Sequence, residues 1–133
     1  MNWDVGQVLK TSVKPPISRD HLRAYAKASG DSNEIHLEDQ FAKEAGFPSV
    51  IVHGMLSMAF MADNCLHNFP ASQYRVIKIG TRFRKVTFPG DVLECGGTVK
   101  KVLENGNLAV SLWIKNQKGE TTTDGEAEIQ IIS

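Results

Sequence analysis

The sequence predicts one α+β domain in which a long apolar helix is covered by a curved antiparallel sheet. Three observations predict this class: helical patterns fill the first half of the chain, strand patterns fill the second half, and short turns separate the strands. A length of 133 residues with 41% hydrophobic residues fits a single domain with an ordinary core. We therefore assign residues 1–133 to one domain.

The first half carries signals for three helices. An apolar pattern at helical spacing begins after Ser18, which suits an N-cap, and ends at Gly30. A short second helix is expected over residues 38–45. The third runs from about residue 54 to residue 68, and because it is apolar on nearly all sides, we expect it to be buried.

Strand patterns dominate the second half. The sequence Glu104-Asn105-Gly106-Asn107 is typical of a β-hairpin turn, because Asn-Gly readily adopts the required left-handed backbone. A further short strand is expected near the N-terminus, over residues 5–9. The four main strands are expected over residues 76–88, 92–102, 108–115 and 123–132.

Charge and cysteine content argue against several classes of function. Fifteen basic and fifteen acidic residues give zero net charge, so bulk nucleic-acid binding is not expected. Cys65 and Cys95 lack a CxxC partner, and we interpret them as two buried thiols. The first residues do not form a secretory signal, and no apolar stretch is long enough to span a bilayer. A cytoplasmic location with no membrane partner is the expectation.

The residues that indicate chemistry lie between the first and third helices. Asp31 and His36 are five positions apart in a predicted loop, and His53 and Gly54 open the apolar helix. A carboxylate accepts hydrogen bonds, while a neutral imidazole offers one donor and one acceptor, so together they can hold and activate one water. The first N–H groups of a helix have no internal partner, so the Gly54 N–H can stabilise an oxyanion.

This pattern resembles the hydratase motif of the MaoC-like family, the (R)-specific enoyl-thioester hydratases and 3-hydroxyacyl-thioester dehydratases of the hot-dog fold. The resemblance implies reversible addition of water to a trans-2-enoyl thioester of CoA or an acyl-carrier protein. The sequence has no Walker or dinucleotide-binding glycine pattern and no convincing cluster of metal ligands, so a reaction with neither cofactor nor metal ion is expected. Glu34 departs from the family, where proline is usual, and this lowers the preorganisation of the loop. The motifs that carry the resemblance are Asp31-x-Asn33-x-x-His36, His53-Gly54-Met55 and residues 83–91.

Five further residues are candidates for binding substrate. Asn33 lies between the catalytic pair, although fixing the loop through backbone groups explains it better. His53 is better explained as a loop anchor than as a second base. Arg82, Arg84 and Lys85 could contact phosphates of coenzyme A or phosphopantetheine, or could equally lie on a solvated strand face.

The catalytic candidates also have purely structural interpretations. Asp31 could form an Asx-turn, and Gly54 could serve only a tight turn into the helix. If Asp31 is catalytic, we expect it to be buried beside the apolar helix.

Two other functions would fit parts of this pattern. A hot-dog thioesterase would need a similar site, and a partner subunit of a heteromeric dehydratase would need no catalytic pair. The spacing and the presence of both Asp31 and His36 favour the hydratase. We expect a homodimer or larger assembly, because a sheet of this kind leaves an edge strand to be covered.

Overall fold

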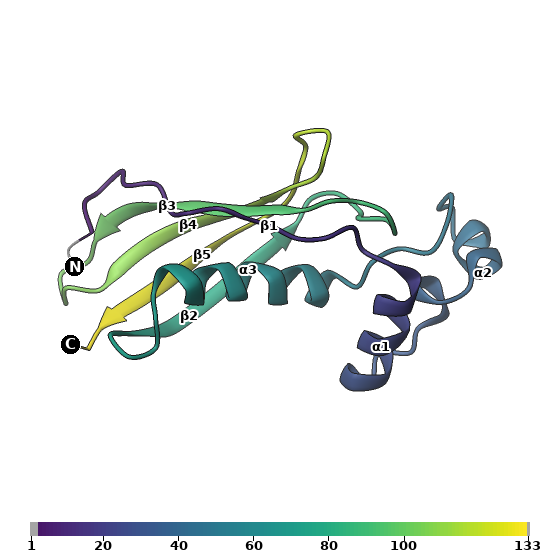
Figure 1. The fold of residues 1–133 in the computed structure, drawn as a ribbon, viewed down its shortest axis with the longest axis horizontal. Helices are drawn as coiled ribbons and strands as arrows, with labels where there is room; N and C mark the ends of the chain where they lie inside the picture. The colour runs from purple at the N-terminus through teal and green to yellow at the C-terminus, as the bar shows by residue number, and fades with distance from the viewer. Residues whose placement is uncertain (1–2, 133) are drawn as a thin grey trace.

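The computed structural model describes residues 3–132 and contains one five-stranded antiparallel sheet with helix α3 (Gly54–Asn68) packed along it. Figure 1 shows α1 (Arg19–Ser29) and α2 (Asp39–Glu44) beyond one end of α3, while both chain termini lie at the other end. This curled α+β arrangement confirms the expected hot-dog fold. The strands, in sheet order, are β1 (Ser12–Val13), β3 (Glu94–Val102), β4 (Leu108–Lys115), β5 (Thr121–Ile131) and β2 (Tyr74–Phe83).

Local sequence signals set the ends of the helices. The Ser18 side chain accepts a hydrogen bond from the His21 backbone N–H at 3.0 Å, which caps the first turn of α1. Gly30 ends the same helix in the left-handed region, with φ of 78°, where glycine is favoured. The predicted range of α3 is confirmed at both ends, and α2 is one residue shorter at each end than predicted.

The core lies between the sheet and one side of α3. Leu56, Met61 and Cys65 of the helix are buried there. The opposite side of α3 is open to solvent, with Met55 55% exposed and Leu66 50% exposed. The prediction that this helix is buried on all sides is therefore wrong for the single chain, because the sheet covers only one of its faces.

The strands depart from the prediction mainly in β2. This strand ends at Phe83 rather than at residue 88, and an irregularity between Val76 and Lys78 leaves Ile77 43% exposed. The bulge breaks the alternation of side chains between the two faces of the sheet at Ile77. The expected strand over residues 5–9 is reduced to one bridge at Val8, and β1 was not predicted.

Two further predictions concern burial. Cys65 and Cys95 are buried thiols, as expected, and burial raises the pKa of each to about 11. Within residues 3–132, no helix has the length and apolar character needed to cross a membrane.

The pairing of β2 with β5 requires a glycine at one position. A Cβ atom at Gly125 would lie 2.3 Å from the Gly80 carbonyl oxygen and 3.3 Å from the Met61 sulfur. We expect Gly125→Ala to lower the free energy of unfolding by about 1–3 kcal/mol, because the Gly80 backbone is held in the sheet. Urea unfolding followed by circular dichroism measures this change.

The matched control is Gly80→Ala in the neighbouring strand. No heavy atom lies within 4 Å of a Cβ atom built at Gly80. We expect its free energy of unfolding to stay within about 0.5 kcal/mol of wild type. Equal effects of the two alanines would contradict the proposed close approach of the strands.

Candidate active site

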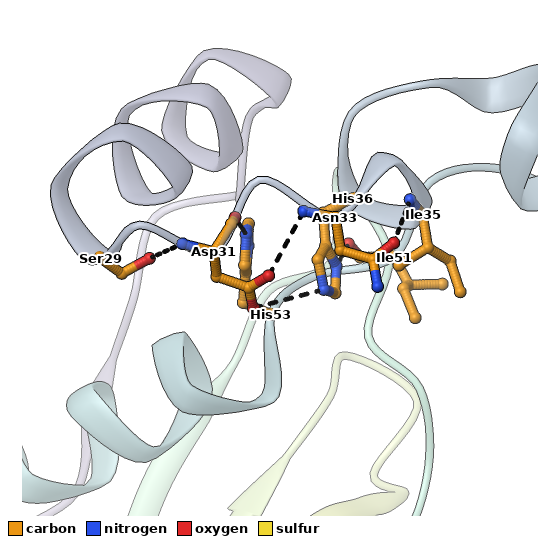
Figure 2. A network of polar contacts seen from close by, with 7 residues as sticks. All are labelled: Ser29, Asp31, Asn33, Ile35, His36, Ile51 and His53. Carbon is orange, nitrogen blue, oxygen red and sulfur yellow. Dashed lines mark hydrogen bonds and ion pairs between the residues drawn. The ribbon is translucent and has the colours of Figure 1, made fainter.

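The candidate residues come from three segments that meet near the N-terminus of α3. Asp31 lies in the loop after α1, and His36 is the last residue of the short 3-10 helix η1 (Glu34–His36). His53 directly precedes α3, and Gly54 is its first residue. Figure 2 shows Asp31, His36 and His53 gathered at this junction. The structure therefore brings together Asp31, His36 and Gly54, the candidate catalytic residues, and His53, the candidate loop anchor.

Asp31 and His36 face each other without a direct hydrogen bond. His36 Nε2 lies 3.9 Å from Asp31 Oδ2, which is beyond hydrogen-bonding distance (Figure 2). The other carboxylate oxygen accepts the Asn33 backbone N–H at 3.4 Å, in the pattern of an Asx-turn. The turn-forming and catalytic interpretations of Asp31 are thus compatible, since each uses a different oxygen.

The hydrogen bond on the far side of the His36 ring determines which nitrogen carries the proton. His36 Nδ1 lies 2.8 Å from the Ile51 carbonyl oxygen. A carbonyl oxygen only accepts hydrogen bonds, so Nδ1 is the donor. In the neutral ring Nε2 then has a free lone pair, and it faces the Asp31 carboxylate. Two acceptors at this separation match a molecule with two O–H donors, such as water.

His53 anchors the loop that carries Asp31. Its Nε2 lies 3.1 Å from the Asp31 carbonyl oxygen and, by the same argument, donates a hydrogen bond to it. The side chain is buried, and Nδ1 has no hydrogen-bond partner. Burial is the main cause that lowers the pKa of His53 below its ordinary value, and the neighbouring His36 adds to the effect. This hydrogen bond is the contact that a loop anchor would make, and the role of His53 stays a prediction.

Asp31 is more exposed than the sequence suggested. Half of its side-chain surface is accessible, whereas only 11% of the His36 side chain is. The expected burial of Asp31 beside the apolar helix is therefore wrong for the single chain, because α1 ends at Gly30 and the loop turns outward. The pair consists of one sheltered imidazole and one carboxylate within reach of solvent.

Gly54 begins α3 and packs against Phe83. No side chain caps this end of the helix. A Cβ atom at Gly54 would lie 3.1 Å from two carbon atoms of the Phe83 ring, so the glycine also lets the end of β2 approach the helix. Sequence reasoning missed this contact, because Phe83 and Gly54 are far apart in the chain and nothing in their two motifs indicates that they pack together.

The remaining candidates are held by other contacts. The Asn33 side chain accepts the Ile35 backbone N–H at 3.1 Å and caps η1, a contact that fits a role in fixing the loop. Asp124 of β5 binds both Arg82 and Arg84, at 3.1 Å and 2.6 Å. Lys85 binds Glu120 at 2.6 Å. None of these contacts links the two arginines or the lysine to Asp31 or His36. Binding of phosphate by these three basic side chains stays a prediction.

Asp31, His36 and His53 each offer a ligand atom within 4.8 Å of the others, a spacing that a metal ion could bridge after small movements. The hydrogen bonds argue against such a site. His53 Nε2 is protonated when it donates to the Asp31 carbonyl, and a metal ligand must be an unprotonated nitrogen. His53 Nδ1 is buried. The arrangement leaves two free ligands, Asp31 and His36, which suit water better than a metal ion.

Comparisons with known proteins place the chain in one family. The model of the MaoC-like domain matches residues 2–130, so the chain belongs to the MaoC-like family. The mitochondrial 3-hydroxyacyl-[acyl-carrier-protein] dehydratase of Arabidopsis thaliana is 30% identical over 129 residues, which cover 92% of this chain and 74% of that protein. The chain spans 13% of two longer relatives, a peroxisomal multifunctional enzyme from Mus musculus and a peroxisomal hydratase-dehydrogenase-epimerase from Saccharomyces cerevisiae.

Solved structures of (R)-hydratases have the same fold. An (R)-hydratase from A. caviae involved in PHA biosynthesis superposes with a TM-score of 0.86 at 25% identity, covering 97% of each chain. An unliganded R-hydratase from Pseudomonas aeruginosa gives a TM-score of 0.85 at 30% identity, covering 96% of this chain and 81% of that one. Both structures are named as (R)-hydratases, and the Arabidopsis relative is named as a 3-hydroxyacyl-[acyl-carrier-protein] dehydratase.

The buried His53 makes stability depend on pH. Because its pKa in the folded protein lies below the ordinary value of 6.5, the unfolded chain takes up a proton first as the pH falls. The stability from neutral His53 is therefore present above about pH 6.5 and lost as the pH falls through the folded pKa. We expect the melting temperature of wild type to fall more between pH 7 and pH 5 than that of His53→Gln, measured by differential scanning calorimetry. Parallel falls would contradict the burial of a neutral ring.

Proposed function

We propose that the protein is a hydro-lyase that adds water reversibly to a trans-2-enoyl thioester of CoA or an acyl-carrier protein. The product is an (R)-3-hydroxyacyl thioester. The observation that carries this proposal is the pair of facing acceptors, Asp31 Oδ2 and His36 Nε2, at 3.9 Å. A water that donates to both has its oxygen lone pairs free to attack carbon. Membership of the MaoC-like family and the (R)-hydratase structures support the reaction class and its stereochemistry.

The chemistry follows from the orientation of these groups. The water oxygen adds to C3 of the enoyl group while the Asp31–His36 pair takes one of its protons, and the pair then returns that proton to C2. Negative charge develops on the thioester oxygen during the addition. The backbone N–H of Gly54, at the positive end of the α3 dipole, is the proposed donor to that oxygen. Such a donor contributes about 2.7–4 kcal/mol to the transition state.

One assay separates the proposed function from its alternatives. Hydration of crotonyl-CoA removes the ultraviolet absorbance of the conjugated thioester and releases no thiol. Release of a thiol, detected with a thiol reagent, indicates a thioesterase instead. If the substrate stays unchanged with this protein while a control hydratase converts it in a parallel assay, the result favours the non-catalytic subunit of a heteromeric dehydratase.

Asp31→Asn and His36→Ala test the shared water. Asparagine nearly preserves the shape of Asp31 but cannot accept the proton, and alanine removes the imidazole. We expect each to lower kcat at least about a hundredfold with the fold intact. The double variant should be little worse than either single one, because residues that act as a unit are not additive. Losses that simply multiply would reject the shared-water arrangement.

Gly54→Ala tests the oxyanion donor, and Phe83 provides the control. The added methyl group lies 3.1 Å from two carbons of the Phe83 ring, a contact that a shift of a few tenths of an ångström relieves, so we expect little loss of thermal stability. We expect kcat to fall, since the methyl group lies where the thioester must approach. The fall should persist in the Gly54→Ala/Phe83→Ala double variant. Recovery of kcat relative to Phe83→Ala alone would assign Gly54 to packing.

We also propose a homodimer that covers the open side of α3 and the free edge of β2. Met55, Leu66, Ile77 and Phe83 are apolar side chains that are each more than two-fifths exposed in this region. Long edge strands pair with other chains, and a twofold axis pairs the same edge twice. An exposed apolar surface of this kind typically marks an interface.

Light scattering at micromolar concentration measures the assembly. We expect the mass of a dimer for wild type and of a monomer for Leu66→Glu, because the new charge faces the proposed interface. The control is Val5→Glu, which places the same charge on an exposed residue near β3, at the other edge of the sheet. A monomeric wild type, or a dimer that survives Leu66→Glu, would refute the proposed interface.

A further inference from the structure

Three aromatic rings from separate segments form a stack behind the candidate catalytic imidazole. His53 lies face to face with His36, with ring centroids 3.9 Å apart and an angle of 21° between the planes. Tyr25, from α1, contacts His53 edge-on at a centroid distance of 4.8 Å. Only 1% of the His53 surface is exposed, so the middle ring of the stack is sheltered from water. The helix α1, the loop with η1 and the start of α3 therefore meet at His53.

The stack restricts a rotation of the His36 ring that its hydrogen bond alone does not prevent. The bond from Nδ1 to the Ile51 carbonyl fixes one point of the ring. One hydrogen bond does not lock the ring, because the outer torsion of a histidine side chain has only a broad preference and the ring can rotate at the expense of that bond. Such a turn would carry Nε2 away from Asp31. Face-to-face contact with His53 fixes the plane of the ring, and Nε2 then has a single direction.

His53 also positions Asp31, the other member of the pair. Its Nε2–H holds the Asp31 carbonyl oxygen at 3.1 Å, which fixes the main chain from which the carboxylate projects. One buried residue thus sets the ring plane of His36 and the backbone position of Asp31. His53 itself cannot reach a substrate, because Nε2 is engaged and Nδ1 is buried.

We propose that His53 and Tyr25 are positioning residues for the Asp31–His36 pair. His53 orients both members of the pair, and Tyr25 supports the His53 ring from the side of α1. The kinetic consequence rests on the proposed hydratase function, whereas the consequence for the orientation of His36 does not.

Two substitutions of His53 separate its two contacts. His53→Phe keeps a flat ring against His36 and loses the N–H donor. His53→Gln keeps an N–H at nearly the position of Nε2 and loses the ring. Nitrogen-15 NMR of the neutral His36 ring in the unliganded protein reports whether Nδ1 alone carries the proton, and the crotonyl-CoA assay gives kcat and KM.

We expect the His36 tautomer to distinguish the two variants, and kcat to fall in both. In wild type and His53→Phe, neutral His36 should be a single tautomer with the proton on Nδ1. In His53→Gln the ring should turn, lose its bond to Ile51 and show a mixture of tautomers. Both variants should lower kcat about tenfold to a hundredfold with little change in KM, since small misplacement of reacting groups is costly. A purely structural role would lower the melting temperature and leave the tautomer unchanged.

Tyr25 provides an independent test, because it is only partly buried. Tyr25→Leu should shift the His36 tautomer and kcat in the same direction as His53→Gln, and Tyr25→Phe, which keeps the ring edge, should restore both. Folded His53→Gln with a single tautomer and wild-type kcat would overturn the proposal; if the His53 variants do not fold, an unchanged tautomer in Tyr25→Leu would do so. If wild type does not hydrate crotonyl-CoA, the proposed function fails while the NMR measurement still decides this inference.

Discussion

Two hydrogen bonds from histidine side chains to main-chain carbonyls hold the candidate site together. His36 donates to Ile51, and His53 donates to Asp31, so the loop after α1 and the connector before α3 are joined in both directions. The Ile51 backbone N–H adds a third bond, to the Ile35 carbonyl, at 3.1 Å. Because carbonyls only accept, these bonds also fix the proton of each neutral ring. The position and the chemical form of the imidazoles therefore have a common cause.

The sheet positions this junction through the connector. The Val52 backbone N–H donates to the Thr87 carbonyl at 2.8 Å, which ties the start of α3 to the segment that follows β2. Phe83, the last residue of β2, packs on Gly54 at the same end of the helix. The helix is thereby held at its N-terminus by the end of β2 and by the segment that follows it. Its outer face stays open, so the rigid end of α3 carries the site while its exposed side is available for assembly.

Short stretches of sequence predicted the features that depend only on neighbouring residues. The cap at Ser18, the stop at Gly30, the full length of α3 and the range of β4 all followed from short stretches of sequence. The candidate residues were found because a motif places them at fixed spacing. The open face of α3, the bulge near Ile77, the contact of Phe83 with Gly54 and the ion pairs of Arg82, Arg84 and Lys85 depend on segments far apart in the chain. No single stretch of sequence contains that information. The ring stack belongs to the same group, since nothing in the sequence indicates that the rings of residues 25, 36 and 53 contact one another.

The bond between Ile35 and Ile51 closes the chain between them into a loop with its ends pinned together. Helix α2 lies within this loop. The Asp39 carboxylate accepts the Val50 backbone N–H at 3.0 Å, near the point where the two ends of the loop meet. The segment between Ile35 and Ile51 therefore leaves and re-enters the site at one point, and lengthening a loop that is closed in this way adds little entropy cost.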